Sequence, residues 1–113
     1  TLQQPHTLCT TNYKYMYWSL AQQLTHHAIT GCNMKAGDML GSGTISGDKK
    51  EEFGSLLELT WGGRDDVELG NGEKRKFILD GDSIIMTGWA IKNGKKIGFG
   101  ECAGTVLPAL DEK

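Results

Sequence analysis

The clearest repeating pattern of apolar residues has helical spacing and lies between Tyr13 and Thr30. The apolar positions recur every three or four residues, as one face of an α-helix requires. They are Tyr13, Tyr17, Leu20, Leu24 and Ala28. Asn12 precedes the pattern as an N-cap and Gly31 follows it as a stop signal. The pattern predicts one long helix from Tyr13 to Thr30.

A second pattern alternates with the period of a β-strand and runs from Ser55 to Trp61. Leu57, Leu59 and Trp61 would share one face, and Glu58 would lie on the other, away from the core. A carboxylate on a rigid strand can orient a catalytic histidine by accepting its ring N–H. A glutamate in such a place is, however, more often a solvated surface charge. Spacing alone leaves both interpretations of Glu58 open.

The second half of the chain alternates between extended segments and turn signals. Met39 to Ser46 looks extended, although its glycines weaken that pattern. The later turn signals are Asn71-Gly72, Asp80-Gly81-Asp82 and Asn93-Gly94. Such dipeptides are typical of hairpin turns, and three turns in a row predict an antiparallel meander.

Two further extended segments complete the expected fold. The Asp80 turn would separate a strand at Lys76 to Leu79 from one at Ser83 to Ile91. Ile97 to Val106 continues as a strand whose glycines predict bulges or close packing. The fold class is therefore α+β and β-dominated, with one long helix followed by antiparallel hairpins.

Length and charge limit what the chain can be. Its 113 residues correspond to one domain, taken as residues 1–113. A net charge of -2 gives no basic field for a phosphate backbone, so nucleic acid is not expected as a partner. No apolar run approaches the roughly 20 residues that span a bilayer, and the first residues lack the order of a signal peptide. We therefore expect no membrane partner.

The cysteines favour a reducing compartment. Cys9, Cys32 and Cys102 are odd in number and far apart, and none forms a C-x-x-C pair. Reduced thiols in a cytoplasmic protein are the simplest explanation, and no structural disulfide is expected.

Thr44 is the second candidate for chemistry. It is flanked by Gly41, Gly43 and Gly47, so the backbone can approach a ligand closely while the hydroxyl donates or accepts a hydrogen bond. The same composition is also typical of an ordinary turn. The glycines do not form a dinucleotide-binding loop, because the third falls at position 47 instead of 46 and a helix, not a strand, precedes them.

His26 and His27 are weaker candidates. On a helix, adjacent side chains diverge by about 100°, so the two imidazoles are poorly placed to share a metal ion. Packing or interaction with the helix C-terminus is the more common role of such residues.

Several segments together resemble one family. From Thr11 to Leu110, the chain is similar to the C-terminal part of the fumarylacetoacetase family, in order and without gaps. The segments that carry the resemblance are NYKYMYWSLAQQLTHH, GDMLGSGTISG, FGSLLELTW, LGNGEKRKFILDGD and IGFGECAGTVLPAL.

The resemblance implies a C–C bond hydrolase that uses calcium or magnesium. It would split fumarylacetoacetate, a diketo acid, into fumarate and acetoacetate in tyrosine catabolism, on a β-sandwich roll that forms homodimers. Thr44 matches a substrate contact of the family, and Glu58 matches the partner of its catalytic histidine, which activates water. That histidine, the metal ligands and the other substrate contacts of the family lie upstream, and neither His26 nor His27 matches the histidine. No metal ligand is therefore expected in this chain, and the chain alone is expected to be inactive.

Two alternatives remain open. The chain could belong to another hydrolase or decarboxylase of the same superfamily, such as an acylpyruvate hydrolase. It could instead be a non-catalytic structural or dimerisation fragment, since the residues matched here include neither the base nor the metal ligands.

Overall fold

The structure is a computed structural model, and it describes residues 4–110. The chain divides into two compact units. One spans Thr7–Lys76, and the other consists mainly of the chain from Phe77 onward. The first holds the helices and one short strand pair, and the second holds a long hairpin. Each unit is described by itself below.

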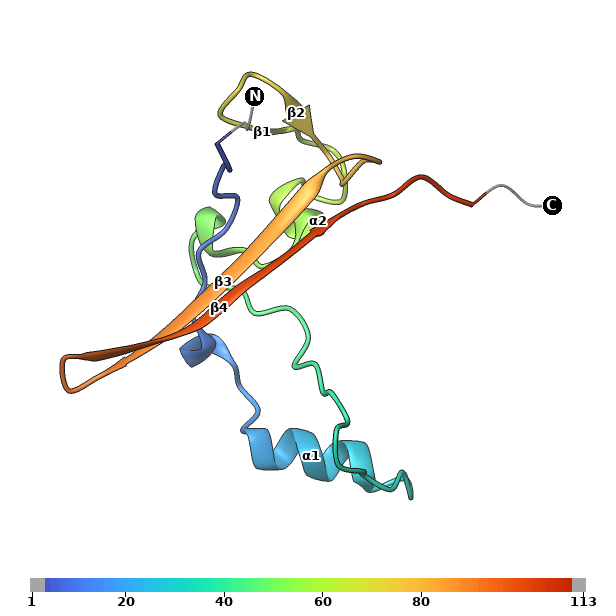
Figure 1. The fold of residues 1–113 in the computed structure, drawn as a ribbon, viewed down its shortest axis with the longest axis vertical. Coiled ribbons are helices and arrows are strands. Elements are labelled where there is room, and N and C mark those ends of the chain that lie inside the picture. Colours follow the sequence, from blue (N-terminus) through green and yellow to red (C-terminus); the bar gives the residue numbers. More distant parts are fainter. Residues whose placement is uncertain (1–3, 111–113) are drawn as a thin grey trace. The chain divides into compact units, whose positions relative to one another are not determined.

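The helical region of the first unit is divided into two pieces, so the prediction of one helix from Tyr13 to Thr30 is wrong. A 3₁₀ turn, η1, covers Tyr13–Tyr15, and the helix α1 covers Leu20–Ala28 (Figure 1). The predicted N-cap, Asn12, caps η1 by accepting a hydrogen bond from the backbone N–H of Lys14.

A capping box sets the true start of α1. The Ser19 hydroxyl accepts from the backbone N–H of Gln22 at 3.3 Å, and the Gln22 side chain accepts from the backbone N–H of Ser19 at 2.8 Å. At the other end, Gly31 has φ of 87° and its N–H donates to the Ala28 carbonyl. The predicted stop at Gly31 is confirmed.

The segment that carries Glu58 is helical, so the prediction of a strand from Ser55 to Trp61 is wrong. A second 3₁₀ turn, η2, covers Lys50–Glu52, and the short helix α2 covers Leu56–Leu59. The Ser55 side chain caps α2 by accepting from the backbone N–H of Glu58.

The end of α2 is closed by two backbone hydrogen bonds. Trp61 N–H donates to the Glu58 carbonyl at 3.3 Å, and Gly62 N–H donates to the Leu57 carbonyl at 2.8 Å. This is the pattern of a Schellman motif, and it places Trp61 in the left-handed region with φ of 49°. Glycine is the usual residue there, which is one reason why the sequence did not show the helix end.

Leu59 and Thr60 are the only buried residues among those that the structure describes. The Thr60 hydroxyl donates to the Leu56 carbonyl at 2.7 Å and accepts from the Gly63 N–H at 3.0 Å. Its polar atoms are therefore satisfied within the turn that ends α2. The buried residues of this unit therefore lie at the C-terminal end of α2.

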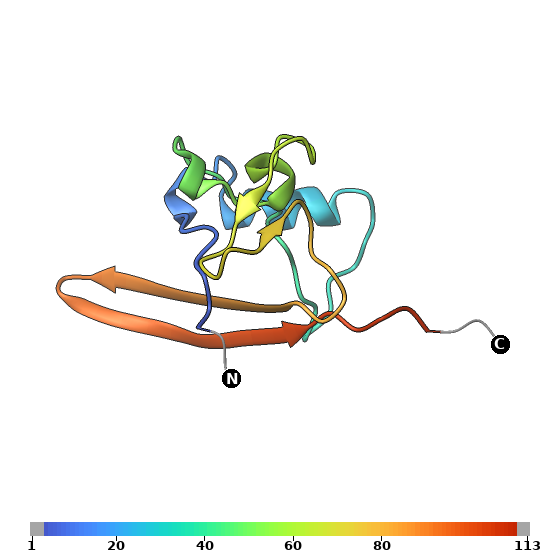
Figure 2. The same cartoon turned by 90° about the horizontal axis from the view of Figure 1, so that it is seen from above.

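Two short strands follow α2. The strand β1, Val67–Glu68, pairs antiparallel with β2, Lys74–Arg75 (yellow in Figure 2). The predicted turn at Asn71-Gly72 connects them, with positive φ at Gly72 only. The chain from Lys76 to Leu79 belongs to no strand of the described structure, so the prediction of a strand there is wrong.

The second unit contains the long hairpin. β3 covers Ser83–Lys92 and β4 covers Lys95–Thr105, and they pair antiparallel along their length. Asn93 and Gly94 both have positive φ, as a type I′ turn requires. The predicted strands and the predicted turn between them are confirmed.

A β-bulge interrupts the pairing of β3 with β4. The register shifts between Thr87 and Trp89, and Gly100 on β4 has φ of 79°. A glycine in that conformation is typical of a bulge, as the glycine-rich sequence predicts. Because residues 76–79 form no strand, the turn at Asp80 joins no pair of adjacent strands, and the predicted continuous meander is wrong. The predicted fold class, α+β and strand-dominated, is confirmed.

Most apolar side chains of the chain are exposed. The accessible surface is 10092 Å², whereas two separately folded units of these sizes would expose about 7,400 Å² in total. Phe99, Met39 and Tyr17 are exposed by 76%, 96% and 84%. A large apolar area is therefore open for packing on other protein surface. No helix within residues 4–110 combines the length and the apolar character needed to cross a bilayer.

Candidate functional site

The candidate site is centred on the Glu58 carboxylate in the Thr7–Lys76 unit. The Ser55 hydroxyl lies 2.7 Å from Glu58 Oε2, and the Ser46 hydroxyl lies 2.9 Å from the same oxygen. Ser55 belongs to the N-terminus of α2, whereas Ser46 comes from the glycine-rich segment before η2. Two hydroxyls from separate segments therefore bind one carboxylate oxygen.

The backbone determines the direction of these hydrogen bonds. The Gly54 N–H donates to the Ser46 hydroxyl oxygen at 3.0 Å, and the Glu58 N–H donates to the Ser55 hydroxyl oxygen at 3.3 Å. A backbone N–H can only donate, so each hydroxyl accepts there and turns its own hydrogen toward Glu58. Both hydroxyl donors then converge on Oε2.

This arrangement favours the ionised form of Glu58. The hydrogen bond from Ser55, followed by that from Ser46, lowers the pKa of the Glu58 carboxyl below its ordinary value. The Ser55 backbone N–H adds a smaller contribution in the same direction as a hydrogen-bond donor to the carboxylate. The second oxygen, Oε1, accepts no side-chain hydrogen bond from the described part of the chain, and in this sense it is the open oxygen. Glu58 is exposed, so Oε1 is available to a donor from elsewhere.

Thr44 and Glu58 are both connected to Gly54. The Thr44 methyl carbon is 3.0 Å from the place that a Cβ on Gly54 would occupy, and the Gly54 N–H is bound to the Ser46 hydroxyl that holds Glu58. The structure thus brings the two predicted site residues into one neighbourhood around Gly54. Thr44 is exposed, so its hydroxyl can reach a ligand.

A second carboxylate supports the same loop. The Tyr15 hydroxyl donates to Glu52 at 2.9 Å, and the Gly47 N–H donates to the Glu52 carbonyl at 3.1 Å. The bond from Tyr15 is the main cause that lowers the pKa of the Glu52 carboxyl. Burial, followed by the negative charges of Glu58 and Glu52, raises the pKa of the Cys9 thiol. Cys9 is therefore a neutral thiol close to both carboxylates.

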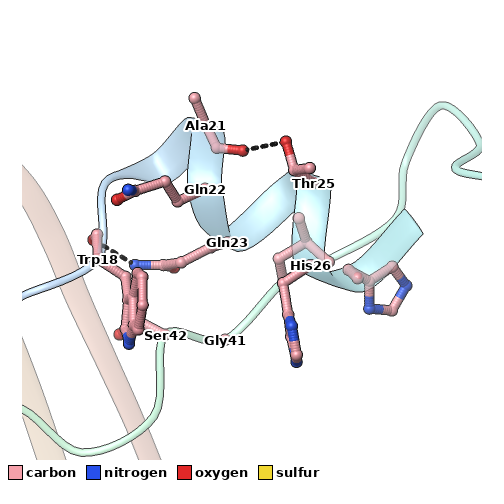
Figure 3. Close-up of a pocket in the computed structure, with 10 residues that line it drawn as sticks. Trp18, Ala21, Gln22, Gln23, Thr25, His26, Gly41 and Ser42 are labelled. Carbon is pink, nitrogen blue, oxygen red and sulfur yellow. Dashed lines mark hydrogen bonds between the residues drawn. The ribbon is translucent and has the colours of Figure 1, made fainter. Parts of the chain in front are cut away.

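A cleft of about 760 Å³ lies elsewhere in the same unit, between α1 and residues 40–42. Figure 3 shows Gln23 and His26 on α1 and Trp18 on the segment that precedes it, with Ser42 on the chain segment across the cleft. His27 also lines the cleft, and its Nε2 lies 3.4 Å from the Cys32 sulfur. Neither Thr44 nor Glu58 lines it.

A metal centre does not fit the part of the chain that the structure describes. Within residues 4–110, no three side chains of histidine, cysteine, aspartate or glutamate are placed to hold one ion. No chemical step is therefore assigned to a metal bound by this chain's described residues.

Sequence reasoning identified Glu58 and Thr44 as candidates and missed Ser46, Ser55 and Gly54. One signal for Ser55 was present, because serine followed three residues later by glutamate is a helix start pattern. It would have shown both the helix and the serine beside the carboxylate. No local pattern could have shown Ser46, which reaches Glu58 only through the fold.

The family model described as "Fumarylacetoacetate (FAA) hydrolase C-terminal" matches residues 6–107. The chain therefore belongs to this family.

Individual relatives agree with that assignment. The chain is 58% identical over 109 residues to the fumarylacetoacetase of Homo sapiens and 60% identical over 109 residues to that of Bos taurus. It is 56% identical over 110 residues to that of Dictyostelium discoideum. Each match covers 96% of this chain but only 26% of the relative, so the chain spans about a quarter of the length of these relatives.

Proposed function

We propose that the complete protein containing this chain is a hydrolase that splits the C–C bond of fumarylacetoacetate to give fumarate and acetoacetate in tyrosine catabolism. The family match supports the hydrolase class. The observation that carries the proposal is the Glu58 carboxylate, which has one oxygen bound by two serines and the other open. In this proposal, residues 1–113 form the C-terminal part of a catalytic domain with a β-sandwich roll.

Glu58 acts through a histidine from outside this chain. Its open oxygen, Oε1, accepts the ring N–H of that histidine and so selects the tautomer whose other nitrogen can remove a proton from water. When the imidazole becomes charged, the ionised carboxylate stabilises it. The resulting hydroxide attacks a carbonyl of the substrate. The C–C bond then breaks with its electron pair leaving on the acetoacetate fragment, and the imidazolium returns to that carbon the proton taken from water. Glu58 itself exchanges no proton.

Thr44 binds the substrate. It is exposed on the segment that packs against Gly54, so its hydroxyl can donate to a carboxylate or carbonyl oxygen of a diketo acid. Such a bond to a charged group contributes about 1.5 to 3 kcal/mol of binding free energy.

Calcium or magnesium completes the proposed enzyme, with ligands outside this chain. When bound, a divalent cation supplies positive charge for the oxygens of a diketo acid. We assign none of its ligands to residues 4–110, where no fitting cluster occurs.

The proposed assembly is a homodimer in the cytoplasm, with no nucleic-acid or membrane partner. The exposed apolar side chains of β3 and β4 support contacts with other protein surface, since strands of this length are seldom left uncovered on both faces.

Two other functions are tested by the same experiment. Another hydrolase or a decarboxylase of the superfamily would cleave a different diketo or acylpyruvate substrate, and a decarboxylase would release carbon dioxide. A structural or dimerisation fragment would leave catalysis independent of Glu58 altogether.

The experiment uses the complete protein containing this chain, purified with calcium or magnesium. Fumarylacetoacetate and an acylpyruvate are supplied separately, and fumarate, acetoacetate and carbon dioxide are measured. We expect fumarate and acetoacetate in equal amounts, with loss of activity after metal chelation and recovery when calcium is restored. Carbon dioxide as a product, or preference for the acylpyruvate, would support the superfamily alternative.

A matched variant tests the role of Glu58 in the same assay. Glu51 is a neighbouring exposed glutamate whose side chain makes no hydrogen bond or ion pair within the described residues. Glu51→Gln should keep full activity, whereas Glu58→Gln should lose most of it. Equal activity of the two variants would favour the structural fragment.

A further inference from the structure

We propose that Ser46 and Ser55 are positioning residues for catalysis, which hold Glu58 so that only Oε1 faces its histidine partner. This inference rests on the proposed function, because it assigns the two serines a role through Glu58. Neither serine is required to touch the substrate. The inference is carried by the geometry around Oε2.

The first step is the fixed polarity of the two hydroxyls. Each serine oxygen already accepts a backbone N–H, from Gly54 for Ser46 and from Glu58 itself for Ser55. Each hydroxyl hydrogen is therefore directed to Oε2, at 2.9 and 2.7 Å. A protonated carboxyl would need to turn its own hydrogen toward one of these donors or expose it elsewhere. The pair thus selects the acceptor-only, ionised carboxylate.

The second step is the rigidity of Ser46. A Cβ on Gly54 would collide with the Ile45 carbonyl oxygen, and a Cβ on Gly47 would lie 2.6 Å from the Tyr15 ring and 2.6 Å from the Glu52 carboxylate. Ile45, which precedes Ser46, is therefore packed against Gly54 too closely for a Cβ there. Gly47, which follows Ser46, is packed against Tyr15 and Glu52 in the same way. Because this packing fixes the backbone, the Ser46 hydroxyl cannot move away from Glu58 without displacing the loop.

The third step is the double use of Ser55. The same oxygen that caps α2 belongs to the hydroxyl that donates to Oε2. The start of the helix and the orientation of the carboxylate are therefore coupled. Any residue that caps through an oxygen can keep the helix, but only one with a hydroxyl hydrogen can also hold Glu58.

These steps leave a carboxylate with one saturated and one open oxygen. Two hydrogen bonds to Oε2 restrict rotation about the last side-chain bond, so the two oxygens cannot exchange places freely. A catalytic constellation needs its groups held close to their productive orientation, and a supporting layer of hydrogen bonds provides that. Without the serines, the carboxylate would remain charged but would sample orientations that do not face the histidine.

The experiment compares four serine variants in the complete protein, with fumarylacetoacetate as substrate and calcium present. Ser55→Thr and Ser55→Gly both keep a residue that is tolerated at the N-cap of α2, but only threonine has a hydroxyl hydrogen for Oε2. Ser46→Ala removes the second donor. Ser42→Ala is the matched control, since the Ser42 hydroxyl bonds only the Gly43 carbonyl in the described structure. Thermal unfolding of each variant separates loss of fold from loss of positioning.

We expect kcat to fall by about 10- to 100-fold in Ser55→Gly and Ser46→Ala, with KM changed less than threefold, as when a group that orients a functional ligand is removed. Ser55→Thr and Ser42→Ala should stay close to the unsubstituted enzyme. If Ser55→Gly does not fold, Ser46→Ala decides by the same criterion. Normal kcat in the folded donor-less variants would overturn the positioning role.

The inference and the proposed function can fail separately. If Glu58→Gln is slow but the serine variants are normal, Glu58 acts without the serines. If Glu58→Gln is itself normal, the proposed function of Glu58 fails and the serines have no catalytic residue to position.

Discussion

The substitution of Glu58 by glutamine is the most informative single change at the site. The two side chains have almost the same shape, but the amide has one acceptor oxygen and one N–H₂ group. Ser46 and Ser55 both direct hydroxyl hydrogens at the place of Oε2. The amide oxygen must therefore occupy that place, because the N–H₂ group there would face two donors. The substitution has one favoured orientation, which the serines determine.

This orientation fixes the consequence for catalysis. With the amide oxygen held by the serines, the N–H₂ group occupies the position of the open Oε1. It presents a donor where the histidine needs an acceptor, so it favours the wrong tautomer of the imidazole. It also lacks the negative charge that stabilises the imidazolium. The corresponding change of aspartate to asparagine in a serine protease triad lowers kcat by about 10⁴-fold, and we expect a loss of that order here.

The fold should not respond in the same way. Both serine hydrogen bonds and the cap of α2 survive the substitution, so the temperature of unfolding should stay within about two degrees of the original. Steady-state hydrolysis of fumarylacetoacetate gives kcat and KM, and calcium titration gives the metal affinity, which should not change. A near-normal kcat in a well-folded Glu58→Gln protein would refute the reasoning and return Glu58 to the role of a solvated charge.

Three further outcomes are expected. Thr44→Val in the complete protein should raise KM by roughly 10- to 100-fold and change kcat less, because a hydrogen bond to a substrate carboxylate exists in both ground and transition states. A large loss of kcat at unchanged KM in steady-state kinetics would contradict this. Cys9 should react with iodoacetamide more slowly than free cysteine at pH 8, because its pKa is raised and less thiolate is present. The fold favours the neutral thiol of Cys9 at pH values below the ordinary pKa of cysteine, and this preference is lost as the pH rises through the raised pKa of Cys9. An alkylation rate equal to that of free cysteine across pH 8 to 10 would contradict the structure. The isolated 113-residue chain should show no hydrolysis and should self-associate in size-exclusion chromatography, because Phe99 and many other apolar side chains are exposed; enzymatic turnover by this chain alone would contradict the division of the site.

Turn chemistry made the C-terminal hairpin predictable from the sequence. Asn93 and Gly94 both take positive φ in the turn between β3 and β4, and asparagine and glycine tolerate that conformation better than other residues. The bulge near Gly100 follows from the same property of glycine. These features depend on one or two residues each, so local sequence contains the necessary information.

The helices were predicted less well because apolar spacing was given more weight than capping. The stripe from Tyr13 to Ala28 has helical spacing, yet Ser19 starts a new helix with Gln22 as the reciprocal partner. Serine followed three residues later by glutamine is a helix start signal. Here it sets the start of α1, although the apolar spacing continues further toward the N-terminus. Where one long helix was predicted, the structure therefore has a 3₁₀ turn followed by a shorter helix.

The same omission changed the structural role assigned to Glu58 without changing its candidacy. Alternating leucines around Glu58 fit a strand, but Ser55 caps a helix one turn long, and the capping hydroxyl also binds the Glu58 carboxylate. Glu58 became a candidate as a polar side chain on a rigid element, and the structure places it on the short helix α2 instead of a strand. Seven residues cannot distinguish a short strand from one helical turn by apolar spacing alone.

The site could not be completed from sequence for a reason that differs from these local errors. Ser46 is 12 residues from Glu58 in the chain, and its hydroxyl reaches the carboxylate only because Gly54 lets the backbone pack against Ile45. The spacing of glycines indicated a close approach, but not which segments approach each other. In the proposed enzyme, Oε1 of Glu58 accepts from a group outside residues 4–110, and an ionised carboxylate limits what that group can be. It must be a donor whose charged form an ionised carboxylate stabilises, and a histidine ring meets that requirement while a second acceptor does not.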